Sequence, residues 1–195
     1  MSEVLQLAEM YQEQAREVLR ETRLLEIWES VGATANLVGS LKNGLLIKRR
    51  DIDLHVYTDP FRLSDSFLAM ARLAENKGIR SIQYANLLDA EDRCLEWHVS
   101  YVSERGDTWK MDIIHILKGS YYDGYFENVA ERILAVLTPE TREAILTIKN
   151  DLPVEEQVMG IEIYQAVIEG GVRDERAFRQ WRELHPPQGI VNWVP

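Results

Sequence analysis

The stretch "VGSLKNGLLIKRRDIDLHVYTD", residues 38–59, places two aspartates one residue apart within an otherwise apolar run. From residue 51 to residue 57 polar and apolar side chains alternate, which is typical of a β-strand with one buried face. Ile52, Leu54 and Val56 would then face one side of the strand. Asp51 and Asp53 would point together toward the other side.

Two carboxylates on one strand face repel each other unless a cation lies between them. Side chains two residues apart on a strand are roughly 7 Å apart, and two charges at about 4 Å repel by on the order of 4 kcal/mol at an intermediate dielectric. A divalent ion removes this cost. Aspartate oxygens favour Mg²⁺ or Mn²⁺ over Zn²⁺, and Mg²⁺ commonly bridges carboxylates and substrate phosphates. The pair therefore indicates a nucleotide substrate.

Gly39 and Ser40 supply groups that suit a phosphate. Glycine lets the backbone approach a phosphate closely, and the serine hydroxyl is a hydrogen-bond donor. Backbone amides at a turn before a helix also suit anions. Lys42, on the same segment, is a further candidate phosphate contact.

The combination resembles a known signature. Gly39-Ser40, ten intervening residues and Asp51-Ile52-Asp53-Leu54 are similar to the motif of the nucleotidyltransferase superfamily related to DNA polymerase beta, including its small antibiotic-nucleotidyltransferase-like or minimal members. In that superfamily a third carboxylate lies on a later strand, and Asp112 in "WKMDIIHI" is the candidate. The resemblance covers about residues 37–116.

The resemblance implies a function and a site. Asp51, Asp53 and Asp112 would be the catalytic and metal-binding residues for Mg²⁺ or Mn²⁺, with Asp112 as a possible base. Gly39, Ser40 and Lys42 would bind the nucleotide. The expected enzyme moves a nucleoside monophosphate, AMP in our interpretation, from an NTP such as ATP to a hydroxyl of a small molecule or a protein. Two metal ions would assist an in-line displacement at the α-phosphate.

Two other functions stay open. Many superfamily members have a small polar residue before the first aspartate, whereas this chain has Arg50. This departure motivates the alternative of a catalytically inactive nucleotide-binding or protein-interaction module with the same fold. A polymerase acting on RNA is the third hypothesis. It is less favoured, because no basic patch with interleaved aromatic residues is visible.

Composition narrows the class of protein and its partners. The chain has 195 residues, 46% hydrophobic and 28% charged, which is ordinary for a folded globular protein. Its net charge of −10 opposes nonspecific binding to nucleic acid or to anionic membranes. Cys94 is the only cysteine, so an intrachain disulfide is impossible. The first 30 residues lack the pattern of a signal peptide, and no long apolar run is present, so we expect a cytoplasmic protein without membrane contact.

The predicted fold is α/β or α+β, with a mixed nucleotidyltransferase sheet flanked by helices. We expect one or two helices over residues 2–31, strands at 35–38, 51–57 and 79–88, a helix at 64–76, and a hairpin over 94–119 that turns near 104–107. Helices are expected near 123–137, 139–150, 154–169 and 174–185, followed by an irregular tail. The predicted domains are a core with its N-terminal helix, residues 1–119, and a helical region, residues 120–195.

Overall fold

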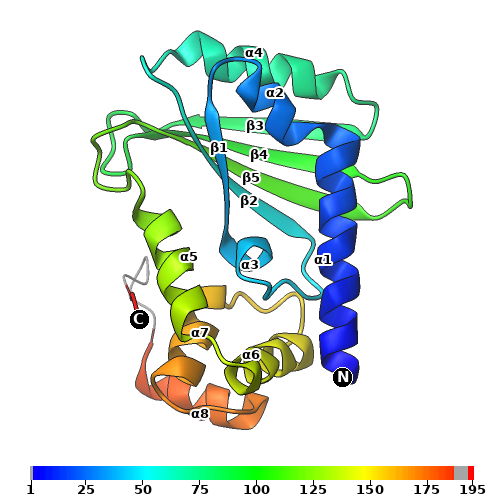
Figure 1. Ribbon diagram of the computed structural model, residues 1–195, viewed down its shortest axis with the longest axis vertical. Helices are drawn as coiled ribbons and strands as arrows, with labels where there is room; N and C mark the ends of the chain where they lie inside the picture. Colours follow the sequence, from blue (N-terminus) through cyan, green and yellow to red (C-terminus); the bar gives the residue numbers. More distant parts are fainter. Residues whose placement is uncertain (1, 187–192) are drawn as a thin grey trace. The chain divides into compact units, whose positions relative to one another are not determined.

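The computed structural model describes residues 2–186 and 193–195, which form helices α1–α8 and strands β1–β5 (Figure 1). The chain divides into two compact units. The sheet unit comprises Glu13–Val38 and Arg50–Glu127. The helical unit comprises Met1–Gln12, Gly39–Arg49 and Asn128–Pro195. Each unit is described by itself below.

The sheet unit is built on five strands in the order β1-β2-β5-β4-β3. β2 pairs parallel with β5, and the other neighbours pair antiparallel. The mixed sheet and its helices confirm the predicted fold class. The strands are β1 (Thr34–Val38), β2 (Asp51–Tyr57), β3 (Ile79–Asn86), β4 (Cys94–Val102) and β5 (Thr108–Ile116).

One face of this sheet is apolar and is covered by helices. Ile52, Leu54 and Ile113 are fully buried there. α2 (Leu24–Glu29) and α4 (Leu63–Ala74) pack along this face (Figure 1). Trp28 of α2 meets the His115 ring edge-on at 5.6 Å between centroids, and Trp97 of β4 donates its indole N–H to Ser66 of α4 at 2.8 Å. The period-two alternation thus leaves the opposite face to the polar side chains.

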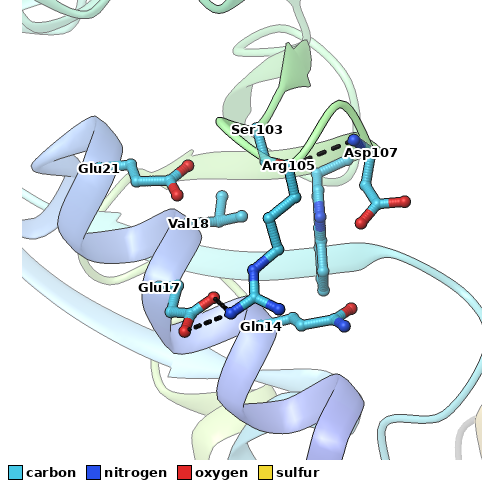
Figure 2. Close-up of a pocket in the computed structure, with 8 residues that line it drawn as sticks. Gln14, Glu17, Val18, Glu21, Ser103, Arg105 and Asp107 are labelled. Carbon is cyan, nitrogen blue, oxygen red and sulfur yellow. Dashed lines mark hydrogen bonds and ion pairs between the residues drawn. The ribbon is translucent and has the colours of Figure 1, made fainter.

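The second half of α1 (Glu3–Thr22) is fixed to the hairpin between β4 and β5. Figure 2 shows Arg105, in the hairpin turn, reaching Glu17 of α1, with an N–O distance of 2.8 Å. The hydroxyl of Tyr101 donates to Glu21 at 2.7 Å. Because both helix residues lie one turn apart, the two contacts hold one side of α1 against the hairpin.

The one or two helices expected over residues 2–31 are two helices in the structure. α1 ends at Thr22 and α2 begins at Leu24, because Arg23 adopts a left-handed conformation with φ of 52°. The Thr22 hydroxyl donates back to the Val18 carbonyl at 2.8 Å. No glycine or proline marks this break, which is why the sequence left the choice between one helix and two open.

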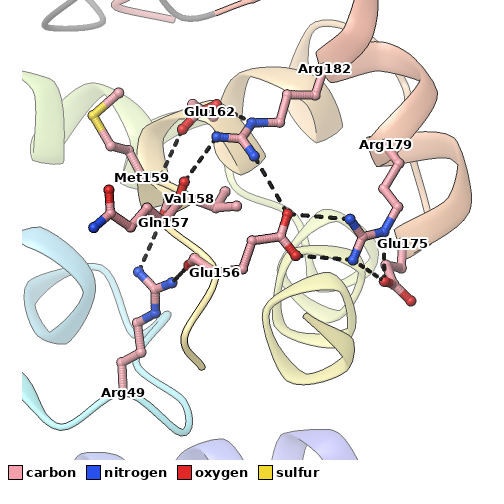
Figure 3. A network of polar contacts seen from close by, with 9 residues as sticks. All are labelled: Arg49, Glu156, Gln157, Val158, Met159, Glu162, Glu175, Arg179 and Arg182. Atoms are coloured by element: carbon pink, nitrogen blue, oxygen red, sulfur yellow. Dashed lines mark hydrogen bonds and ion pairs between the residues drawn. The ribbon is translucent and has the colours of Figure 1, made fainter. Parts of the chain in front are cut away.

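The helical unit contains α6 (Pro139–Asp151), α7 (Gly160–Ile168) and α8 (Glu175–Leu184), together with the part of α5 (Tyr125–Val136) from Asn128 onward. Thr138 caps α6 as expected: its hydroxyl accepts from the Thr141 amide at 3.2 Å. The helix predicted from residue 154 begins only at Gly160. Figure 3 shows the reason, since the carbonyls of residues 156–158 accept hydrogen bonds from the guanidinium groups of Arg49 and Arg182. These bonds hold the segment in a non-helical path.

Two further expectations from the sequence concern membrane-spanning helices and the C-terminal tail. In the described residues, none of the helices combines the length and the apolar character needed to cross a bilayer. Residues 187–192 of the predicted irregular tail lie outside the described residues.

The buried His115 makes folding stability depend on pH. Burial lowers the pKa of His115 to about 4, whereas an unfolded histidine titrates near 6.5. Between these values only the unfolded chain binds the proton, so stability falls as the pH is lowered from 6.5 to 4. This one group accounts for a loss of about 3 kcal/mol over that window. Urea unfolding measured at several pH values, together with NMR titration of the histidine ring protons, checks this expectation.

The control is a His115→Gln variant, whose side chain does not titrate. Its unfolding free energy should vary less steeply between pH 6.5 and 4 than that of the wild type. A ring signal of His115 that titrates near 6.5, or equal slopes in the two proteins, contradicts the assignment.

Candidate active site

The polar face of the sheet gathers the three aspartates on adjacent strands. Asp51 and Asp53 lie on β2, and the parallel register pairs Asp53 directly with Asp112 of β5. Partners in a parallel ladder point to the same face, and neighbouring strands are about 4.8 Å apart. The three carboxylates predicted as the catalytic set therefore share one face. On the other side of Asp53 its register partner is Val38, the last residue of β1.

A histidine on β4 contacts the third aspartate. His98 is the register partner of Asp112, and its Nδ1 lies 2.6 Å from Asp112 Oδ1. The other ring nitrogen lies 3.6 Å from Glu96. The hydrogen bond with Asp112 raises the pKa of His98 above its usual value, and Glu96 adds to this effect. The contacts place the His98 imidazole between two carboxylates on this face, Asp112 and Glu96.

The oxygens of these three carboxylates are suitable ligands for a hard divalent cation such as Mg²⁺. Asp51 Oδ1 is buried and has no hydrogen-bond partner among the described residues. A buried carboxylate oxygen without a donor is costly, and a metal ion would satisfy it. In residues 2–186 and 193–195, no three acidic, histidine or cysteine side chains converge as a metal-binding group. Asp112 is turned toward His98, so binding an ion would require this carboxylate to exchange partners.

The Gly-Ser motif follows β1 directly. Gly39 has a φ of 65°, a left-handed value that glycine adopts without strain, and it begins the short helix α3 (Gly39–Lys42). The expected nucleotide-binding residues Gly39, Ser40 and Lys42 thus all lie on α3, in the helical unit. Lys42 is exposed at the end of this helix.

Within the helical unit, Ser40 is held by two residues that the sequence did not single out. Lys149 of α6 donates from Nζ to the Ser40 hydroxyl at 2.8 Å and to the Leu45 carbonyl at 2.7 Å. The hydroxyl of Tyr164, on α7, lies 3.1 Å from Ser40 Oγ. Lys149 is a strong candidate anion contact because its ammonium is fixed beside the Ser40 hydroxyl. Lys149 lies 109 residues from Ser40 in the chain, so a local sequence motif could not identify it.

Arg50, whose position departs from the superfamily pattern, forms an ion pair in the sheet unit. Its guanidinium lies 2.9 Å from Asp107, in the β4–β5 turn. Its carbonyl accepts from the Lys110 amide at 2.8 Å, which is a hydrogen bond of the first β2–β5 pair, Asp51 with Lys110. Arg50 therefore fixes the start of β2, the strand that carries Asp51 and Asp53.

The fold is found in solved structures, although no family model and no curated protein sequence matches the chain. A crystal structure of Cid1 poly(U) polymerase matches with a TM-score of 0.54 and 15% identity over 85% of this chain and 53% of that one. A structure of Cid1 poly(U) polymerase with MgGTP bound matches with a TM-score of 0.57 and 16% identity, over 85% of this chain and 55% of that one. The structure of a cytoplasmic RNA terminal U-transferase matches with a TM-score of 0.54 and 14% identity, over 85% of this chain and 51% of that one.

These structures are similar to this chain in fold. The chain spans about half the length of each. The fold is the one seen in these poly(U) polymerase and terminal U-transferase structures. The fold resemblance predicted from the Gly-Ser and Asp-Ile-Asp motif is thus confirmed. The roles of individual residues stay predictions.

Removing the charge of Asp51 should stabilise the metal-free protein. An amide is cheaper to bury than a carboxylate with an unsatisfied oxygen and a like charge on the same face, so Asp51→Asn should raise the free energy of unfolding in EDTA by about 1 kcal/mol. The same variant should lose any stabilisation by Mg²⁺. Urea unfolding in EDTA and in MgCl₂ measures both effects.

Asp89→Asn is the matched control, because Asp89 is exposed and lies in the loop after β3. It should behave like the wild type in both buffers. A lower stability of Asp51→Asn than of the wild type in EDTA would contradict the view that Asp51 is destabilising until an ion binds.

Proposed function

We propose that the protein is a metal-dependent nucleotidyltransferase that moves a nucleoside monophosphate from an NTP to a hydroxyl acceptor. ATP is the nucleotide we favour, and a small molecule or a protein is the acceptor class. The observation that carries the proposal is the parallel register that pairs Asp53 with Asp112 on the face that also bears Asp51. Three carboxylates on one sheet face suit a metal-bound triphosphate better than any purely structural role.

The chain's own residues divide the chemistry between them. Asp51, Asp53 and Asp112 would hold Mg²⁺ or Mn²⁺, which when bound neutralises phosphate charge and lowers the pKa of the acceptor hydroxyl. Asp112 accepts the hydroxyl proton, and His98 positions the Asp112 carboxylate through their 2.6 Å contact. Ser40, Lys42 and Lys149 bind the triphosphate and stabilise the departing pyrophosphate. Gly39 lets the backbone approach it closely.

The similar structures support this class of chemistry and a second acceptor. One of them is a Cid1 poly(U) polymerase solved with MgGTP bound, which supports a metal–nucleotide complex as the ligand here. Because that protein and the RNA terminal U-transferase act on RNA, the 3′ hydroxyl of an RNA is the second acceptor class and UTP the second nucleotide to test. The acidic net charge of −10 favours the small-molecule or protein acceptor.

Nucleotide binding should depend on magnesium and on residues from both motifs. Thermal unfolding with ATP, GTP, CTP and UTP should show a rise in Tm of several degrees for the preferred nucleotide only when Mg²⁺ is present. Asp51→Asn/Asp53→Asn should abolish the rise. Lys149→Ala should weaken nucleotide affinity by about tenfold, because a charged hydrogen bond is lost.

Lys77→Ala, at an exposed lysine outside these motifs, is the matched control and should bind like the wild type. Equal shifts in the wild type and the double aspartate variant would refute the metal site. A nucleotide-dependent shift without turnover of any acceptor, including RNA, would favour the inactive nucleotide-binding module.

A further inference from the structure

The edge of the sheet at β3 is open along its length. β3 is the last strand of the sheet, and among the described residues its only strand neighbour is β4 (Figure 1). Sheet edges are usually protected by charged side chains or proline. Residues 81–86, SIQYAN, contain neither, and Ser81, Gln83, Tyr84 and Asn86 are exposed. This segment pairs with β4 in unbroken register, so its outer side is ready to pair with another strand.

The neighbouring helix α4 carries apolar side chains on its outer side as well as on its inner side. Ala69 and Leu73 are fully buried. Leu63, Phe67 and Leu68 are each more than two fifths exposed. A helix that is apolar on both sides is usually covered by protein on both sides, so the outer side of α4 indicates a contact with another chain.

Aromatic rings join the outer side of α4 to the edge of the sheet. The Phe67 ring lies 4.9 Å from the rings of Tyr84 and Trp97, and these two rings are 4.6 Å apart. Trp97 is buried, whereas Phe67 and Tyr84 are both more than a third exposed. Leu63, Phe67, Leu68 and Tyr84 therefore make up one exposed apolar patch, which we call the β3–α4 surface. Exposed aromatic side chains of this kind are enriched at protein interfaces.

The register with β4 determines what a pairing strand must offer. Tyr84 is opposite Trp97, which is buried on the apolar face of the sheet, and Ile82 shares this face because it lies two residues earlier. Gln83 is opposite His98, on the polar face. The matching strand is therefore apolar toward the helices and uncharged toward the other face.

β3 of a second copy meets these requirements. In an antiparallel pair with a two-fold axis at Gln83, Ile82 of each copy lies opposite Tyr84 of the other. On the polar face Ser81 lies opposite Ala85, and Gln83 lies opposite its own equivalent. Pairs of aromatic and β-branched side chains stabilise antiparallel sheets. The axis is perpendicular to the sheet, so the α4 helices of both copies lie on the same side.

The charges that flank β3 are also complementary between two copies. Antiparallel pairing sets the start of one β3 against the end of the other. Residues 75–80, ENKGIR, have a net charge of +1, and residues 87–93, LLDAEDR, have a net charge of −2. Opposite charges therefore meet at both ends of the pair. Two chains with a net charge of −10 each can thus approach at this edge.

From this arrangement we propose that the β3–α4 surface is a homodimer interface, in which two copies of this chain join their sheets through antiparallel β3 strands. The aspartates of both copies then lie on the same face of one continuous sheet. Five strand spacings separate the two Asp112 residues, a distance of roughly 24 Å across the sheet. This pairing does not depend on the proposed nucleotidyl transfer, because it uses no residue of the candidate active site.

Substitutions at the two-fold axis test the interface. In sedimentation velocity over a series of protein concentrations, the wild type should reach twice the mass of one chain. Gln83→Lys and Gln83→Glu should each weaken this dimer by about tenfold or more, because like charges then lie opposite each other. An equimolar mixture of the two variants should restore the dimer, since opposite charges then meet at the axis.

Gln180→Lys is the matched control, because it makes the same change at an exposed glutamine of α8, in the helical unit. It should dimerise like the wild type. Amide hydrogen exchange gives a second readout: exchange in β3 should slow as the concentration of the wild type rises, but not in Gln83→Lys. Phe67→Ser, at an exposed position of α4, should also weaken the dimer and replaces Gln83→Lys if that variant does not fold.

Three results would each overturn the homodimer. The first is a wild type that remains monomeric over the whole series, with β3 amides that exchange at the same rate at every concentration. The second is a folded Gln83→Lys variant that dimerises as tightly as the wild type. The third is a mixture of folded Gln83→Lys and Gln83→Glu variants that stays monomeric.

Discussion

The parallel pairing of β2 with β5 is the constraint on which the candidate chemistry depends. It sets Asp53 beside Asp112, and the two-residue repeat of the strand keeps Asp51 on the same face. A shift of one residue in this register would move Asp112 to the opposite face, among the buried apolar side chains. The covering helices α2 and α4 make such a shift costly, because Trp28 and Ser66 contact specific residues of the apolar face.

The same register gives the sheet one apolar face that stabilises the fold and one polar face that bears the candidate site. Leu54, Ile113 and Trp97 are buried on the first, and His115 is kept neutral there by burial. The second face bears Asp51, Asp53, Asp112 and His98. Like charges on one face oppose folding, so the apolar face must supply enough stability to hold them together. The alternation of side chains along the strands thus provides both the buried apolar face and the candidate site.

Features of the structure that depend on residues close together in the chain could be predicted from the sequence. The alternation of residues 51–57 predicts β2, and the Thr138-Pro139 pair predicts the start of α6, because both signals lie within a few residues. The third aspartate required a resemblance to a superfamily, since nothing local links Asp112 to Asp53. Lys149 beside Ser40, and Glu127 beside Asn36, were not predicted at all. They are 109 and 91 residues apart, so only the tertiary fold brings each pair together.

The most direct test of the central claim is to locate a bound divalent ion relative to the two faces of the sheet. Mn²⁺ added with ATP to the wild type should broaden the NMR ring signals of His55 and His98, on the carboxylate face, well before that of His115 on the opposite face. This preference should disappear in Asp51→Asn/Asp53→Asn. Equal broadening of the three histidines in the wild type, or an unchanged preference in the double variant, would contradict a metal site built from the aspartates of β2.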